Sequence, residues 1–174
     1  MDEKYIIGID LGGMSAKGGL FTEKGELLTE ASVSTNKLDG FNGTLQKLEY
    51  LTRILVEKQG VDYHDVLSIG VGSPGVVDGG RGIILRWSNY DWDSVPFVEQ
   101  LSSLTGKKVV VANDANVAAL GEAKFGATAQ YQSSILLTIG TGIGGGIVFD
   151  GKLDRKSTRL NSSHVRVSRM PSSA

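Results

Sequence analysis

The 174-residue chain has 40% hydrophobic and 21% charged residues and a formal net charge of −1, a composition that is typical of a soluble globular protein and argues against disorder throughout. The absence of cysteine excludes disulfides and thiolate metal sites and fits a reducing compartment. No apolar run could span a membrane, and the first predicted strand follows Met1 too closely for a signal peptide, so we expect a cytoplasmic protein without membrane contact.

The first predicted element is a short β-branched strand over Tyr5–Ile9. It is followed by the glycine-rich stretch Asp10–Lys17 and by a second apolar strand that contains Gly18–Phe21. This pattern predicts a hairpin whose tight turn exposes backbone N–H groups, and such groups bind phosphate oxygens. We therefore predict that Gly12 and Gly13 contact the phosphates of a nucleotide.

Three polar side chains flank this turn. Asp10 ends the first strand, and a carboxylate so close to phosphates requires a bridging cation, which predicts a Mg²⁺ ligand, direct or through water. Alternatively, Asp10 only stabilises the turn by accepting backbone N–H bonds. Ser15 and Lys17 offer the phosphates a hydroxyl and a cation, although Lys17 fits a solvated strand position equally well.

Alternating strands and helices follow along the chain. Residues 26–35 alternate as a more exposed strand, residues 43–59 have leucines at helical spacing, and residues 66–71 form a short apolar strand. This strand enters the turn Gly72-Ser73-Pro74-Gly75, whose glycines let a ligand approach the backbone. Gly75 is therefore a candidate substrate contact.

A second group of elements follows this turn. A helix is predicted over residues 95–105, with Ser94 as its cap and Pro96 in its first turn. A central strand over residues 109–112 and an Ala-rich and Leu-rich helix over residues 116–125 complete the group.

A second glycine-rich stretch, residues 138–146, joins an apolar strand over 135–139 to another strand over 146–149. Its glycine spacing matches the dinucleotide fingerprint, as does that of residues 70–75, but neither is followed by the helix that a Rossmann site requires. We instead predict a second phosphate-binding hairpin, and two such hairpins can clamp one triphosphate between two domains. Its predicted nucleotide contacts are Thr141, Gly142 and Gly145.

Four ordered motifs resemble those of the ROK family of sugar kinases, which have the actin/hexokinase ATPase fold. They are Asp10–Gly13, Gly72–Gly75, Asn113–Asn116 with the helix that follows, and Gly140–Gly146. The resemblance extends over about residues 5–153. It implies an α/β fold: an RNase H-like lobe and the first hairpin of a truncated second lobe.

The resemblance also implies a domain organisation. Residues 1–120 would form the N-terminal ATPase lobe with sugar-site residues, and residues 121–153 the start of the second lobe. Residues 154–174 would be a disordered tail outside both lobes. ATP and a hexose or N-acetylhexosamine would be the small-molecule partners, and the full-length protein would be a possible homodimer.

Three residues receive sugar-site roles from the same resemblance. Asp114 would be the general base that takes the proton of the attacking hydroxyl, and Asn113 would bind neighbouring hydroxyls. Both residues also match a helix N-cap signature. Relatives carry an asparagine and a tryptophan with similar spacing, so Asn89 is a further candidate for binding sugar hydroxyls; alternatively, the aromatic residues around it only close a loop over the core. Met14 stands where the family more often has threonine.

Two departures from the family bear on activity. Relatives continue with a Glu-x-Gly-His segment and a histidine/cysteine zinc cluster, and neither follows Leu153, so the zinc ligands are absent here. We therefore expect this fragment to be inactive by itself. The alternative is a sugar-responsive ROK transcriptional regulator, but such regulators carry a DNA-binding domain ahead of the first strand, where only residues 1–4 stand here.

The last 20 residues differ from the rest in charge. Residues 155–174 carry five basic and no acidic residues, whereas residues 1–154 carry 13 basic and 19 acidic residues. The tail has no apolar period, and we expect it to be disordered. It could be a nucleic-acid or membrane-binding arm, a solvated native terminus, or a foreign segment. Residues 155–164 resemble translated adaptor sequence, which favours the foreign segment and no nucleic-acid partner.

Overall fold

The computed structural model describes residues 3–139 and 143–154. The chain divides between Val117 and Ala118 into an N-terminal unit and a C-terminal unit. In the described residues, no helix combines the length and apolar character needed to cross a membrane. The predictions for the tail, from residue 155 onward, lie outside the described residues.

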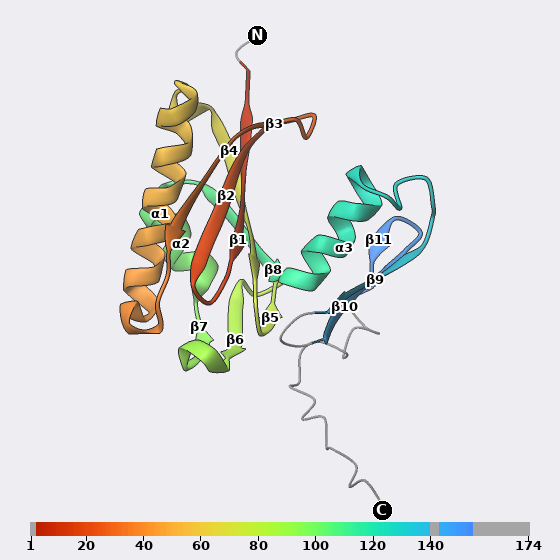
Figure 1. Cartoon of the computed structure of the whole chain (residues 1–174). Helices are drawn as coiled ribbons and strands as arrows, with labels where there is room; N and C mark the ends of the chain where they lie inside the picture. Colours follow the sequence, from red (N-terminus) through yellow and green to blue (C-terminus); the bar gives the residue numbers. More distant parts are fainter. Residues whose placement is uncertain (1–2, 140–142, 155–174) are drawn as a thin grey trace, which may run out of the picture. The chain divides into compact units, whose positions relative to one another are not determined.

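A five-stranded mixed sheet forms the centre of the N-terminal unit (Figure 1). β1 pairs antiparallel with β2 and parallel with β4, and β4 pairs parallel with β8. The predicted α/β fold is therefore confirmed. In sheet order, the strands are β3 (Leu27–Ser34), β2 (Ser15–Thr22), β1 (Tyr5–Leu11), β4 (Val66–Ser73) and β8 (Lys108–Asn113).

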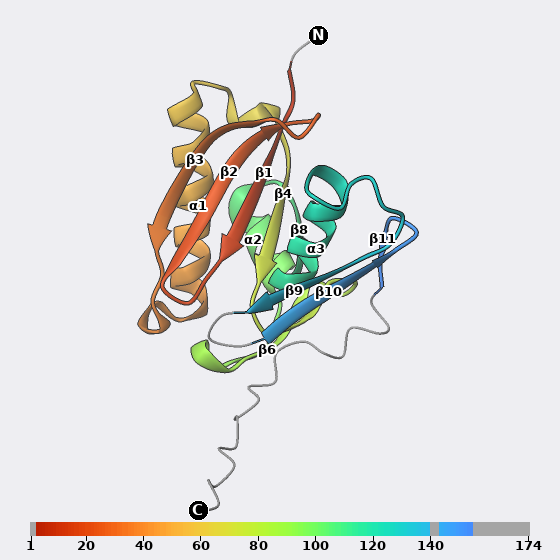
Figure 2. The same ribbon diagram turned by 45° about the vertical axis from the view of Figure 1, so that its right-hand side comes forward.

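Two helices cover one face of this sheet (Figure 2). α1 (Gly40–Gln59) packs on β2 and β3, and α2 (Phe97–Thr105) packs on β8 and on α1. Residues alternate between the two faces of a strand, so Ile7 and Ile9 of β1 are buried while Asp10 is exposed. Burying each large apolar side chain of this core contributes about 1.5–3 kcal/mol.

α1 follows the predicted leucine spacing. Its buried residues include Leu45, Leu48, Leu51, Leu55 and Val56. The helix begins at residue 40, three positions before the predicted start at 43, because the 3₁₀ turn η1 (Lys37–Asp39) leads directly into it. Reciprocal hydrogen bonds between Asn36 and Asp39 hold this entrance as a capping box.

A small antiparallel sheet, absent from the sequence prediction, follows β4. Its strands are β5 (Val76–Asp78), β6 (Ile83–Trp87) and β7 (Trp92–Val95), and the 3₁₀ turn η3 (Ser88–Tyr90) joins the last two. The prediction of Ser94 as the cap of α2 is wrong, because Ser94 lies in β7 and α2 begins after Pro96. A residue that precedes proline is sterically kept out of helical conformation, so the helix cannot include Val95.

Aromatic side chains fix the small sheet to the helices. Trp87 stacks on Tyr90 with ring centroids 4.0 Å apart, and Trp92 meets Phe41 of α1 edge to face at 5.1 Å. Trp87 at the end of β6, Tyr90 of η3 and Trp92 at the start of β7 are all buried. These aromatic residues therefore close a loop over the core, which was one of the two interpretations given above for the segment around Asn89.

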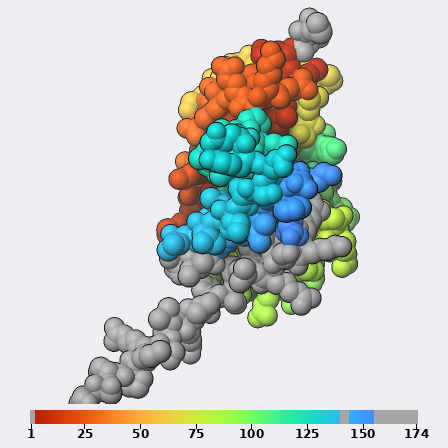
Figure 3. Space-filling view, turned by 90° about the vertical axis from the view of Figure 1, so that its right-hand side faces the viewer, coloured from red at the N-terminus to blue at the C-terminus, as the bar shows by residue number. Residues whose placement is uncertain are grey.

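The C-terminal unit contains the second predicted hairpin. α3 (Asp114–Phe125) begins before the boundary between the units and continues into this one. β10 (Ile143–Phe149) pairs antiparallel with β9 (Ser134–Ile139) and with β11 (Lys152–Leu153). Figure 3 shows the surface of α3 and this hairpin. The large apolar side chains that are exposed in the C-terminal unit are Leu120, Phe125, Tyr131, Ile135, Leu137, Ile139 and Phe149.

β9 gives rise to a prediction about self-association. Ile135, Leu137 and Ile139 alternate along one face of the strand and are 68%, 65% and 83% exposed. Because contiguous exposed apolar groups on a sheet favour association, we expect the chain to form oligomers at micromolar concentration. Light scattering should show a mass that rises with concentration.

Leu137→Lys should lower that mass, whereas Leu38→Lys, at an exposed apolar residue of η1, should leave it unchanged. A monodisperse monomer of the unaltered chain over the same concentrations would contradict the expectation.

Candidate active site

The carboxyl ends of the parallel strands bring several predicted site residues together. Asp10 of β1 pairs with Gly72 of β4, and Ser73 of β4 pairs with Asn113 of β8. Asp114 follows as the first residue of α3. Ligands of open α/β sheets bind at this edge, outside the carboxyl ends of the strands.

Asp114 is a half-buried carboxylate at the start of a helix. Burial raises its pKa and the nearby charge of Asp10 raises it further, while the Ala115 N–H and the Asn113 side chain act in the opposite direction. Its Oδ1 accepts a 2.8 Å hydrogen bond from the Ala115 N–H. A carboxylate whose pKa is raised toward the working pH is a better proton acceptor, so Asp114 suits general-base chemistry.

Asn113 is 4% exposed, and both polar atoms of its side chain are engaged within the protein. Its Nδ2 donates to the Gly75 carbonyl at 3.2 Å, and its Oδ1 accepts from the Asn116 N–H at 3.2 Å. The second bond caps α3, as the N-cap signature indicated. Asn113 thus holds the turn at Gly75 against the start of the helix that carries Asp114.

The first glycine turn is closed by a hydrogen bond from the Gly12 N–H to the Ser15 carbonyl, at 2.9 Å. A Cβ at Gly12 would lie 2.8 Å from that carbonyl oxygen, so only glycine fits. The N–H groups of Gly13 and Met14 have no hydrogen-bond partner among the described residues. The turn therefore offers two unpaired donors of the kind that bind phosphate oxygens.

The side chains around this turn differ in accessibility. Asp10 and Lys17 are exposed and face each other across the β1–β2 pair, Ser15 is half-buried, and Met14 is 85% exposed. No described residues form a group of three or more His, Asp or Glu that could hold a metal ion. A single carboxylate fits Mg²⁺, which keeps several waters and binds through one or two carboxylates and nucleotide phosphates. It does not fit zinc, whose cysteine ligands are absent.

Gly75 packs directly against β6. Its φ of +85° is strained for other residues, and a Cβ there would lie 2.2 Å from the Arg86 carbonyl oxygen. Ser73, on the same turn, is fully buried and donates to the Pro74 carbonyl at 3.2 Å. The glycine is thus required by packing, whether or not a ligand approaches it.

Asn89 is exposed in η3 and lies in the sequence between Trp87 and Tyr90, whose rings stack on each other. Its amide is therefore open to a ligand. Tyr90 follows it and donates a hydrogen bond to the Gly13 carbonyl at 3.1 Å, which the sequence gave no sign of.

The second hairpin is described in part. Thr141 and Gly142 lie outside the described residues. Gly145 lies within β10, opposite Leu137, so no helix begins at the third glycine of the fingerprint-like pattern. The structure thus excludes a Rossmann arrangement at this glycine.

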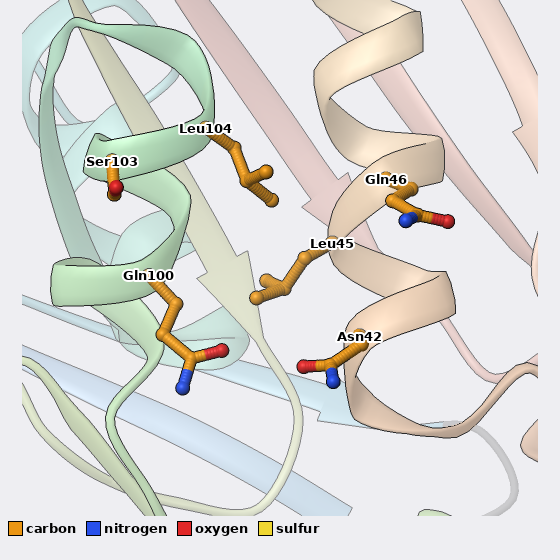
Figure 4. Close-up of a pocket in the computed structure, with 6 residues that line it drawn as sticks. All are labelled: Asn42, Leu45, Gln46, Gln100, Ser103 and Leu104. Carbon is orange, nitrogen blue, oxygen red and sulfur yellow. The ribbon is translucent and has the colours of Figure 1, made fainter.

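A separate groove of about 360 Å³ lies between α1 and α2 (Figure 4). Its walls carry only neutral side chains, and none of the predicted site residues contributes to it. The lining residues are Asn42, Leu45, Gln46, Gln100, Ser103 and Leu104. Because it lacks charged and titratable groups, the groove does not compete with the strand ends as a catalytic site.

The raised pKa of Asp114 predicts a pH-dependent stability. Its contribution to folding is fully present below the ordinary value of 3.8 and is lost as the pH rises through the raised value in the folded state. Asp114→Asn, which removes the charge, should therefore increase the melting temperature at neutral pH. Calorimetry should find the difference largest at neutral pH and close to zero below about pH 3; an equal difference at both pH values would contradict the assignment.

The sheet order, the two covering helices and the carboxylates at the strand ends define an α/β fold of the actin/hexokinase ATPase class. Residues 6–158 match the ROK family, and the chain belongs to it. A glucokinase of Thermotoga maritima is 36% identical over 88% of this chain and 47% of its own length. The chain thus spans about half the length of such curated relatives.

Two further relatives differ in what they do. The structure of a ROK family glucokinase from Streptomyces griseus in complex with glucose and AMPPNP matches 87% of this chain and 46% of its own, with a TM-score of 0.78 and 36% identity. A xylose repressor of Caldicellulosiruptor bescii is 33% identical over 88% of this chain and 39% of its own length. Family membership therefore includes both kinases and repressors.

Proposed function

We propose that the chain is the N-terminal part of a sugar kinase that transfers the γ-phosphoryl group of ATP to a hydroxyl of a hexose or N-acetylhexosamine. The observation that carries this proposal is the half-buried Asp114 at the carboxyl end of the sheet, with a pKa raised by burial and by Asp10. Phosphoryl transfer needs positioning, electrostatic stabilisation and a base for the attacking hydroxyl. This edge of the sheet carries side chains and backbone N–H groups suited to positioning, to electrostatic stabilisation and to acting as the base.

The residues take the following roles in this proposal. Asp114 accepts the proton of the attacking hydroxyl, and Asn113 keeps Asp114 in place through the cap of α3. The unpaired N–H groups of Gly13 and Met14 hold phosphate oxygens. Mg²⁺, when bound, would neutralise charge on the phosphates beside Asp10.

The remaining predicted contacts complete the proposed site. Asn89 and the turn at Gly75 line the sugar side, and Ser15 and Lys17 supply further groups near the phosphates. The second glycine-rich stretch supplies further proposed phosphate contacts. Its proposed contacts are Thr141, Gly142 and Gly145.

A chimera tests the proposal. Residues 1–153 would be joined to the C-terminal half of the Thermotoga maritima glucokinase, and a coupled assay would measure ADP release over a panel of hexoses and N-acetylhexosamines. We expect sugar-dependent turnover from the chimera and none from the 174-residue chain, because positioning of both substrates needs the second lobe. A folded chimera that binds sugar without turnover would contradict the proposal.

That last outcome would favour the second candidate, a sugar-responsive ROK regulator. The similarity to the xylose repressor supports it. Glucokinases match the chain at somewhat higher identity, and the carboxylate pair Asp10 and Asp114 has a direct use in phosphoryl transfer. The kinase is therefore preferred.

A further inference from the structure

Three segments that are far apart in the sequence meet at the first glycine turn. Thr35, which follows β3, donates its hydroxyl to the Gly12 carbonyl at 3.0 Å and its N–H to the Met14 carbonyl at 3.0 Å. Tyr90 of η3 donates its hydroxyl to the Gly13 carbonyl at 3.1 Å. All three carbonyls of the turn therefore accept a hydrogen bond from outside it.

These bonds also fix the direction of the unpaired N–H groups. A trans peptide is planar, so the carbonyl of one residue and the N–H of the next point in opposite directions from the same rigid unit. The Gly13 carbonyl shares its unit with the Met14 N–H, and the Gly12 carbonyl shares its unit with the Gly13 N–H. Holding each carbonyl from one side thus aims the N–H of the following residue toward the other side.

The Tyr90 ring is well placed to impose such a direction. It is 5% exposed, stacks on Trp87 with an interplanar angle of 9°, and meets Trp92 edge to face at 5.4 Å. The next residue, Asp91, forms an ion pair with Lys37 at 2.5 Å, which ties the same loop to the segment of Thr35. The hydroxyl therefore reaches the turn from a buried ring that is held by one stacked and one edge-to-face aromatic contact.

We propose that Tyr90 is a positioning residue for the nucleotide: through the Gly13 carbonyl, it aims the Met14 N–H at a phosphate oxygen. This inference rests on the proposed function, since it takes the phosphates of ATP as the ligand of the turn. It adds a residue outside the glycine motif, 77 positions from its partner in sequence, to the phosphate site. Thr35 has the same relation to the Gly13 N–H.

The test compares Tyr90→Phe with Tyr50→Phe in the full 174-residue chain. Tyr90→Phe keeps the ring and its stacking and removes only the hydroxyl, and Tyr50, 60% exposed on α1, is the matched control. Titrations with magnesium ATP and with glucose, followed by amide resonances in ¹⁵N spectra, would give both affinities. We expect Tyr90→Phe to weaken magnesium ATP about 2- to 10-fold, as for loss of one hydrogen bond, without changing the glucose affinity.

Equal magnesium ATP affinities in the two variants would overturn the inference, as would an equal loss of ATP and glucose affinity, which indicates a merely structural role. Amide hydrogen exchange at Met14 supplies a readout without ligand. Exchange that is faster in Tyr90→Phe than in the control supports the inference, and unchanged exchange overturns it. The proposed function is tested separately by the turnover of the chimera, and the exchange result at Met14 decides the role of Tyr90 even if the unaltered chain binds neither ligand.

Thr35→Val offers a second variant in case Tyr90→Phe fails to fold. It keeps the shape of a buried side chain and removes the hydroxyl that holds the Gly12 carbonyl. We expect faster exchange at Gly13 and a similar, about 2- to 10-fold, loss confined to magnesium ATP. Unchanged amide exchange at Gly13 would contradict the inference that a hydrogen bond to a carbonyl of the turn orients the N–H of the next residue.

Discussion

Asp114→Asn is expected to slow sugar phosphorylation by the chimera about 10²- to 10⁴-fold, the range found for loss of a general acid or base. Asparagine has nearly the same shape and can still accept the Ala115 N–H bond through its Oδ1, but it cannot take the proton of the attacking hydroxyl. The loss should therefore appear in kcat, with the KM values for sugar and ATP changed little.

Asp62→Asn is the matched control for this experiment. Asp62 precedes the 3₁₀ turn η2 (Tyr63–Asp65), which leads into the amino end of β4, and its side chain accepts a bond from the His64 N–H. Its replacement should leave kcat unchanged. If Asp114→Asn retained more than about a tenth of the turnover, a general-base role for Asp114 would be wrong.

Gly75→Ala is expected to lower the free energy of unfolding by about 3–5 kcal/mol. Two costs combine: the positive φ, about 1–2 kcal/mol for a residue with a Cβ, and the overlap of that Cβ with the Arg86 carbonyl oxygen, which forces β6 and the turn apart. The hydrogen bond from Asn113 to the Gly75 carbonyl should be lost with this movement. Urea unfolding measures the difference.

Gly60→Ala separates these two costs. Gly60 ends α1 with a φ of +73°, but a Cβ there would meet nothing within 4 Å. Its replacement should cost only the backbone term, about 1–2 kcal/mol. Equal losses for the two variants would show that the turn at Gly75 yields to the added atom without strain.

The elements with a strong local signal were predictable from the sequence. Leucines at positions 45, 48, 51 and 55 gave the face of α1, and the β-branched runs before glycine gave β1, β4 and β9. In each case, the residues that determine the element lie within it. Short strands such as β5 and β7 lacked a readable period, because three or four residues cannot establish one.

The site was predictable only as far as its motifs. Asp10, the glycine turn and Asp114 could be proposed as site residues because each stands at the end of an apolar strand. The engagement of both Asn113 side-chain atoms and the bond from Tyr90 to the turn depend on partners 38 and 77 positions away. No local pattern reports such contacts, since they arise only when the sheet is assembled.

The strand order also determines when the site forms. β1, β2 and β3 are neighbours in the chain and pair as an antiparallel meander, whereas β4 joins β1, and β8 joins β4, only after long intervening segments. Closing such loops costs conformational entropy before the hydrogen bonds of the parallel pairs form, so pairing of β4 and β8 is expected to be slower than formation of the meander. Asp114 directly follows β8, the last of these strands in the chain and an edge strand of the sheet, so the proposed general base reaches its place only when the sheet is complete.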